Sequence, residues 1–135
     1  MIVDTSALLA YFDTDEPDHG AVSRVIDAAT EPLVVSPYVV AELDYLVATR
    51  HGVAVELQVL EELANGAWDL PAFGVEDVVA AGAVIRRYAD QRLGVADASN
   101  VILAGRYATR SIVTLDRRHF EVVRPVSGGR FRILP

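Results

Sequence analysis

Residues 1–9 read Met1-Ile2-Val3-Asp4-Thr5-Ser6-Ala7-Leu8-Leu9, an apolar run that stops at an acid and passes at once into a helical pattern. A second apolar run, Ile112-Val113-Thr114-Leu115, also stops at an acid, Asp116. The carboxyl ends of parallel strands lie on one edge of their sheet, and ligands of such sheets bind beyond that edge. We therefore expect Asp4 and Asp116 to meet there.

Short apolar runs alternate with helical patterns along the rest of the chain. Such alternation favours a parallel sheet that helices cover on both faces. The expected strands span residues 1–3, 32–35, 67–70, 111–115 and 131–134, and the expected helices span residues 5–12, 19–29, 37–50, 54–65, 75–92 and 96–107. No internal repeat or linker interrupts the series, so we expect a single domain over residues 1–135.

The composition restricts the class of protein. Hydrophobic residues make up 52% of the 135 residues, yet no apolar run approaches the roughly 18 residues that a membrane span needs. The first residues lack the basic flank and the apolar length of a signal peptide. Cysteine is absent, which excludes disulfides and thiolate metal sites. We therefore expect a cytoplasmic protein that does not associate with membranes.

Charge is distributed unevenly along the chain, whose formal net charge is −7. Residues 1–109 carry 6 arginines and 17 acids, whereas residues 110–135 carry 6 arginines and 2 acids. A net-acidic protein is a poor general binder of polyanions. A nucleic acid would therefore be held by the basic C-terminal part and by metal ions at an acidic site.

Asp4 and Glu42 stand where carboxylates are unusual. Asp4 closes an apolar run, and its alternative role is to cap the following helix, although Thr5 and Ser6 can serve as caps instead. Ser6 is also placed to hydrogen-bond a carboxylate. Glu42 lies at the border of the apolar face of its helix, where an unpaired carboxylate is costly. A salt bridge to an arginine would satisfy Glu42. Because other acids in the chain also stand at unusual positions, we favour a role for Glu42 as a metal ligand.

Asp97 and Asp116 complete a set of four acids. Asp97 opens a helix, so a cap is its alternative role. Ser99 and Asn100 follow it and either line the same pocket or are ordinary first-turn polar residues, the interpretation that we favour for Asn100. Asp116 precedes two arginines, and pairing with them is its alternative role. If the fold gathers the four carboxylates, a hard divalent cation would explain the cluster, and phosphodiester chemistry would be its use.

Four stretches of the chain stand out together as motifs. They are Ile2-Val3-Asp4-Thr5-Ser6, Pro37-Tyr38-Val39-Val40-Ala41-Glu42-Leu43, Ala96-Asp97-Ala98, and Val113-Thr114-Leu115-Asp116-Arg117-Arg118-His119-Phe120. In this order and at this spacing the chain resembles the PIN-domain proteins, and among them the VapC-type ribonuclease toxins of bacterial toxin–antitoxin pairs. The resemblance covers essentially the whole chain.

The resemblance implies a three-layer α/β/α sandwich with a central parallel sheet, and the toxin of a type II toxin–antitoxin system. Such a toxin inhibits growth as a Mg²⁺-dependent endoribonuclease, with Mn²⁺ as a substitute, and cleaves structured transfer or ribosomal RNA with a metal-activated water. The resemblance also implies a cognate antitoxin, and either a homodimer or a heterotetramer or larger complex with that antitoxin. By the same resemblance, the catalytic residues are Asp4, Glu42, Asp97 and Asp116.

Within that site, the resemblance implies that Asp4 and Asp97 hold the metal directly, with Ser6 and Ser99 behind them. Relatives often carry a further acid where this chain has Ser99 or Asn100, which leaves open whether one or two metals bind. We expect Arg110, Arg117 and Arg118 to contact RNA phosphates, with solvated or ion-paired side chains as the alternative.

The remaining expectations concern partners, the histidines and alternative functions. Residues 19–29 and 37–63 carry more apolar positions than one core face needs, which predicts an antitoxin groove or a dimer surface there. The three histidines, His19, His51 and His119, are interpreted as surface or helix-end residues without a catalytic part. A catalytically silent PIN-like module that binds proteins is the alternative function. A phosphotransfer domain is disfavoured because such domains usually use a lysine and this chain has none.

Overall fold

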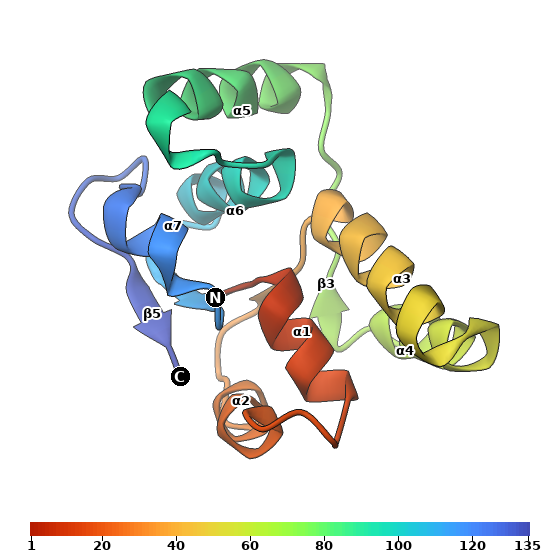
Figure 1. The fold of residues 1–135 in the computed structure, drawn as a ribbon. Coiled ribbons are helices and arrows are strands. Elements are labelled where there is room, and N and C mark those ends of the chain that lie inside the picture. Colours follow the sequence, from red (N-terminus) through yellow and green to blue (C-terminus); the bar gives the residue numbers. More distant parts are fainter.

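Five short parallel strands form a single sheet in the order β3-β2-β1-β4-β5 (Figure 1). The computed structural model describes residues 1–135. The strands are β1 (Ile2–Val3), β2 (Leu33–Val34), β3 (Trp68–Asp69), β4 (Ser111–Val113) and β5 (Arg132–Leu134). Each lies inside a segment that the sequence predicted as a strand, because short apolar runs between turns can be buried on both faces.

Eight helical segments connect the strands. They are α1 (Thr5–Phe12), α2 (His19–Asp27), α3 (Pro37–His51), α4 (Val53–Leu63), α5 (Val75–Arg87), the short 3₁₀ helix η1 (Ala89–Gln91), α6 (Val95–Arg106) and α7 (Arg117–Val122). None of them combines the length and the hydropathy that a membrane crossing requires.

The strand register divides the apolar side chains between two cores. Ile2 pairs with Val34 and with Ile112, and all three belong to the core that α6 and α7 cover. Val3 and Val113 form the next rung and belong to the opposite core, under α1 to α4. Successive side chains of a strand point to opposite faces, so one sheet supplies both cores. The three-layer α/β/α sandwich with a central parallel sheet is confirmed.

The start of α3 follows the expected local chemistry. Ser36 is the N-cap, its Oγ accepts a hydrogen bond from Tyr38 N at 3.2 Å, and Pro37 occupies the first turn. Gly52, with φ +82°, ends the helix in a conformation that suits glycine. Ser36 Oγ also lies 2.6 Å from Ser99 Oγ of α6, and both side chains are fully buried. This contact fixes the helix that carries Glu42 against the helix that carries Asp97.

Two expectations about helices were wrong. The helix expected over residues 75–92 ends at Arg87, and the chain then forms η1 and a left-handed residue at Arg92, φ 55°. Residues 117–122 were not expected to be helical but form α7. A six-residue helix is too short to show a repeating apolar face in the sequence, and its single buried residue is Phe120.

Phe120 anchors α7 to the sheet. Its side chain is 1% exposed, and its ring meets that of Phe131 edge to face, with 5.6 Å between centroids. Because α7 begins directly after Asp116, the packing of Phe120 also determines where Asp116 and His119 lie.

Replacing Phe120 by alanine is expected to destabilise the protein by about 3–5 kcal/mol, the usual result of emptying a large aromatic site in a core. Urea unfolding followed by circular dichroism measures the change. Val122→Ala on the same helix is the matched control, because Val122 is 42% exposed and its truncation should change stability by no more than about 0.5 kcal/mol. Equal effects of the two substitutions would contradict the anchoring role of Phe120.

Candidate functional site

The carboxyl ends of β1 and β4 lie side by side at the point where the strand order reverses. From β1 the chain proceeds to β2 and β3 on one side, and from β4 it proceeds to β5 on the other. Asp4 N donates to Val113 O at 3.0 Å, which places Asp4 beside Thr114. Such a switch point is where open α/β sheets bind their ligands.

Asp4 is a buried carboxylate that only neutral donors hold. Its side chain receives hydrogen bonds from Thr114 Oγ1 at 2.8 Å, from Ser6 Oγ at 3.1 Å and from Asn100 Nδ2 at 2.9 Å. The residue is 6% exposed. Although Asp4 precedes α1, its side chain makes no capping hydrogen bond, so the alternative role as a helix cap was wrong.

Burial raises the pKa of Asp4 above its ordinary value of 3.8, and the hydrogen bond from Thr114, which lowers the pKa, offsets only part of this. The negative charge of Asp97 raises the pKa further, whereas the hydrogen bond from Ser6 lowers it. A carboxylate in this position is short of positive charge, which a bound cation would supply.

Glu42 and Asp97 reach the same pocket from two helices. Glu42 accepts a hydrogen bond from Thr5 Oγ1 at 2.6 Å and forms no salt bridge, so the arginine pairing considered from the sequence was wrong. Asp97 is the third residue of α6 and so not its N-cap, but its Oδ2 accepts from Gly94 N at 3.0 Å, which caps the start of the helix from its first turn. The same oxygen lies 3.2 Å from His119 Nδ1.

Asp116 is held by a guanidinium and by the loop that follows β4. Arg118 donates two hydrogen bonds to its carboxylate, at 2.9 and 2.7 Å, and these bonds lower the pKa of Asp116. The pairing with a neighbouring arginine, the alternative considered from the sequence, is therefore present. The backbone N of Asp116 donates to Thr114 Oγ1 at 3.1 Å and to Ser6 Oγ at 3.4 Å.

All four acids line one open pocket with a volume of about 370 Å³. Two basic residues, Arg50 and His119, line the same pocket. No three His, Asp or Glu side chains stand at the spacing of a preformed metal site. The fold thus gathers the predicted carboxylates, while direct coordination by several of them at once would need side-chain movement or bridging waters.

Several predicted residues lie elsewhere than expected. Ser99 is buried, bonds Ser36 Oγ and Ala96 O, and contacts none of the acids. Arg110 precedes β4 and so lies at the opposite end of the strand from the pocket. Arg117 donates a hydrogen bond to Pro135 O, and Arg118 donates hydrogen bonds to Asp116. The structure therefore does not bring Ser99 or Arg110 to the acidic pocket, whereas Ser6 lies against Asp4 as expected.

Three residues of the site were missed or misjudged from the sequence. Asn100 is fully buried and bonds Asp4, so its interpretation as an ordinary first-turn residue was wrong. Its spacing of three residues from Asp97 is a signal, since such residues share a helix face. Thr114 lies under Asp4, and His119 lines the pocket instead of the outer surface. The spacing of three residues between Asp116 and His119 signals a shared helical turn only once α7 is known.

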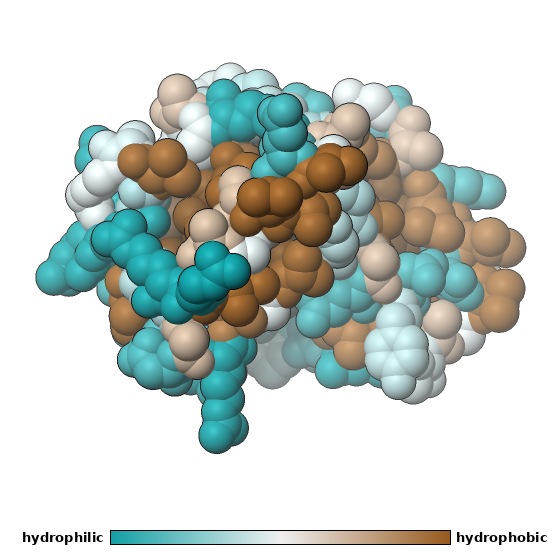
Figure 2. Space-filling model, turned by 90° about the horizontal axis from the view of Figure 1, so that it is seen from above, coloured by the Kyte–Doolittle hydropathy of each residue, from teal (hydrophilic) through white to brown (hydrophobic).

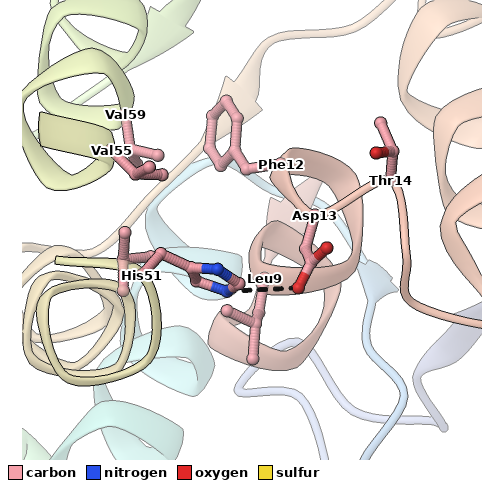
Figure 3. Close-up of a pocket in the computed structure, with 8 residues that line it drawn as sticks. Leu9, Phe12, Asp13, Thr14, His51, Val55 and Val59 are labelled. Carbon is pink, nitrogen blue, oxygen red and sulfur yellow. Dashed lines mark ion pairs between the residues drawn. The ribbon is translucent and has the colours of Figure 1, made fainter.

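A second, apolar hollow of about 100 Å³ adjoins the acidic pocket, and the two share Leu9. Figure 3 shows Val55 and Val59 of α4 facing Phe12 of α1, with His51 at the end of α3 directed toward Asp13. His51 Nε2 lies 3.2 Å from Asp13 Oδ2. The hollow therefore has an apolar floor and a polar rim.

Comparison with known proteins agrees with this geometry. A family model described as PIN domain matches residues 1–125. The chain belongs to the PIN-domain family. Ribonuclease VapC26 of Mycobacterium tuberculosis (strain ATCC 25618 / H37Rv) is 63% identical over 135 residues, which is 100% of both chains. The resemblance to VapC-type proteins that the four motifs predicted is confirmed.

Two solved structures share the fold of this VapC-type chain. The crystal structure of VapC20 of Mycobacterium tuberculosis, a toxin that cleaves the Sarcin-Ricin loop, superposes with a TM-score of 0.79 at 16% identity, over 85% of this chain and 88% of that one. At that identity the likeness supports the fold alone. FitAcB from Neisseria gonorrhoeae superposes with a TM-score of 0.64 at 25% identity, over 88% and 89% of the two chains.

The raised pKa of Asp4 predicts how the stability of this VapC-type protein depends on pH in EDTA. Between 3.8 and the raised pKa, the folded protein keeps a proton that the unfolded chain releases. The contribution of Asp4 therefore makes the fold more stable as the pH falls through that window. Asp4→Asn, which carries no charge, is expected to melt at a higher temperature than the parent at pH 7, and the difference should shrink on acidification.

Asp116→Asn is the matched control, because Arg118 lowers the pKa of Asp116 and its charge stabilises the fold above 3.8. This variant should melt at the same temperature as the parent or lower at pH 7. Thermal melts of both variants at a series of pH values test the pair. A lower melting temperature for Asp4→Asn at pH 7 would contradict the electrostatic description of the buried carboxylate.

Proposed function

We propose that this VapC-type chain is a Mg²⁺-dependent endoribonuclease and the toxin of a toxin–antitoxin pair, and that Asp4, Glu42, Asp97 and Asp116 are its catalytic residues. The observation that carries the proposal is the buried Asp4 carboxylate at the strand switch point, held by neutral donors within a pocket that three further acids line. We expect the protein to act in the cytoplasm, where RNA is available.

The residues of the pocket fit a hard divalent cation. Their ligand atoms are carboxylate oxygens, which Mg²⁺ and Mn²⁺ prefer, and the charge of Asp97 already raises the pKa of Asp4. Mg²⁺ keeps several of its waters, so two direct ligands suffice. Asp4 and Asp97 would hold the ion directly, and Glu42 and Asp116 would act through waters.

The bound ion and the protein side chains would contribute to the reaction in different ways. Bound Mg²⁺ supplies charge neutralisation at the scissile phosphate and a water acidic enough to attack it near neutral pH. Ser6, Thr114 and Asn100 fix the orientation of the Asp4 carboxylate, as outer hydrogen bonds do for metal ligands. Thr5 occupies one oxygen of Glu42, which leaves the other free to accept a proton or a hydrogen bond.

On the grounds of the family and of the open pocket, we propose that the substrate is structured RNA with an unpaired loop, from transfer or ribosomal RNA. Unpaired loops present bases and phosphates that a pocket can reach. Arg117 and Arg118 flank the site at the start of α7, and Arg118 is largely exposed beyond its contact with Asp116. These two arginines remain our candidates for phosphate contacts.

The apolar hollow of Figure 3 is a suitable binding site for an apolar side chain of the antitoxin. It lies between α1, α3 and α4, and half of its lining residues belong to residues 37–63, one of the two segments where the sequence predicted a partner groove. A segment bound there would extend directly into the acidic pocket, because the two hollows share Leu9. An arginine on that segment would meet the four acids and compete with the metal.

Self-association has a separate candidate surface on α5. Val75, Val78 and Val79 are exposed on that helix, at 82%, 45% and 69%. Figure 2, which views the molecule from the side of α5, shows an apolar patch among polar residues on this face. A patch of this kind on both copies would suit the two-fold contact of a homodimer, and four-chain or larger assemblies with antitoxin would follow from it.

A catalytically silent protein-binding module is the second candidate function. The pairing of Asp97 with His119 and of Asp116 with Arg118 favours it, because both acids then have structural partners. Calorimetric titration with Mn²⁺ separates the candidates. The nuclease should bind the ion through Asp4 and Asp97, and a silent module should not.

Asp4→Asn and Asp97→Asn are each expected to lower the rate of RNA cleavage by at least about 100-fold, because both remove a carboxylate that would hold the ion. Cleavage of total transfer and ribosomal RNA in Mg²⁺ measures the effect, and EDTA should abolish the parent activity. Asp44→Asn, on the same helix as Glu42 but not lining the pocket, is the control with unchanged activity. Full activity of either pocket variant would end the proposal.

Val55→Asp is expected to weaken binding of the cognate antitoxin at least tenfold and to leave RNA cleavage unchanged, since it places a charge in the apolar hollow. Leu57→Asp is the matched control, because Leu57 is 54% exposed and lies on the other side of α4. Calorimetry with purified antitoxin and a thermal melt of each variant decide the comparison. Equal loss of affinity in both variants would place the antitoxin elsewhere.

A further inference from the structure

Three residues of α3 form one wall of the acidic pocket. Glu42, Leu46 and Arg50 are spaced by four residues, so they follow one another along the same side of the helix, and all three line the pocket. The rise of a helix places Arg50 about 12 Å from Glu42 along the axis. The pocket is therefore a groove whose α3 wall has Glu42 at one end and Arg50 at the other.

The guanidinium of Arg50 is only weakly engaged within the protein. A single contact joins its Nη1 to Glu16 Oε1 at 3.3 Å, with the two side chains 48% and 32% exposed. An ion pair this exposed contributes little, and the guanidinium has five N–H donors in all. The other basic residue of the groove, His119, is directed at Asp97. Arg50 is thus the one permanent positive charge in the groove.

We propose that Arg50 binds a phosphate of the RNA strand, in place of Glu16, at a distance from the scissile phosphate. The inference rests on the proposed nuclease function of the same pocket. Because Glu42 and Arg50 lie about 12 Å apart along the helix axis, the phosphate that Arg50 contacts is a different one from the scissile phosphate. Arg50 is accordingly a positioning residue that sets the strand along α3, and its guanidinium exchanges Glu16 for the phosphate when RNA binds.

The direction of the side chains favours RNA over a protein partner as the ligand of Arg50. The next residue, His51, lines the apolar hollow and pairs with Asp13, whereas Arg50 lines the acidic pocket. At the end of α3, Arg50 thus lines the groove and His51 lines the apolar hollow beside it. A groove that otherwise carries four carboxylates repels a polyanion, and a cation at its far end offsets that repulsion.

The test measures RNA affinity instead of cleavage. In an Asp4→Asn background with Mg²⁺, fluorescence anisotropy follows binding of a labelled RNA hairpin with an unpaired loop. Arg50→Ala is expected to weaken binding about five- to tenfold, as the loss of a charge-assisted phosphate contact does. The plot of log affinity against log salt concentration should lose about 0.7 to 1 from its slope. Arg50→Lys should keep the slope.

Arg24→Ala is the matched control. Arg24 is an exposed arginine in the last turn of α2, as Arg50 is in the last turn of α3, but it lines a different cavity near Met1. The control should change neither the affinity nor the salt slope. Glu16→Gln should act in the opposite direction and tighten RNA binding by up to about fivefold, because it releases Arg50 from its ion pair.

Each outcome is decisive for one claim. Unchanged RNA affinity and salt slope in Arg50→Ala would overturn the inference, as would a loss confined to antitoxin binding, which would assign Arg50 to the protein partner. Weaker RNA binding by Glu16→Gln would also overturn it. Absence of metal-dependent cleavage by the parent protein would instead refute the proposed function, and full cleavage by Asp4→Asn would do the same. Thermal melts confirm that each variant is folded.

Discussion

The parallel pairing of β1 with β4 is the contact on which the pocket depends. It joins residues about 110 positions apart in sequence, through the rungs Ile2–Ile112 and Val3–Val113 and the bond from Asp4 N to Val113 O. One residue beyond those rungs, the side chains of Asp4 and Thr114 meet. Ser6, within the first turn of α1, then binds both the Asp4 carboxylate and the backbone of the loop that carries Asp116. The positions of Asp4 and Asp116 are therefore set by backbone pairing, whereas those of Glu42 and Asp97 follow from the packing of α3 against α6.

The electrostatics of the pocket oppose the stability of the fold. Burial raises the pKa of Asp4, and three neutral donors supply its hydrogen bonds where a salt bridge would stabilise it more. Asp97 and Asp116, which are more accessible, have basic partners within the chain. A carboxylate kept buried without a counter-charge is a cost that the surrounding structure must offset, and such costs are typical of functional sites. The partnered acids can exchange their basic groups for solvent or a ligand at a smaller cost.

The sequence predicted the parts of this arrangement that follow from periodicity and strand ends. Asp4 and Asp116 close apolar runs, so their approach to one edge of the sheet could be inferred, whereas Glu42 and Asp97 were assigned to the same site by the family resemblance. The spacing of Asn100 from Asp97 indicates a shared helix face, but the bonds of Asn100 and Thr114 to Asp4 could not be assigned, because they depend on which side chain lies opposite after folding. Ser99 pairs with Ser36 for the same reason, since the contact belongs to the packing of two helices. The sequence did not predict helix α7, because six residues are too few to show the repeating apolar face of a helix.

The charges along α3 help to explain how a net-negative protein can bind RNA, which is itself negatively charged. The formal net charge of −7 repels a polyanion at a distance, and the four acids repel it again within the pocket. Arg117 and Arg118 stand at one side of these acids, at the start of α7, and Arg50 stands at the far end of the groove. A strand that touched both sides would cross the acids between two positive groups, where the bound cation would neutralise the remaining repulsion. The positive charges that attract RNA thus lie only along the path of the bound strand. They would orient the RNA in the groove, although the protein surface as a whole is not basic.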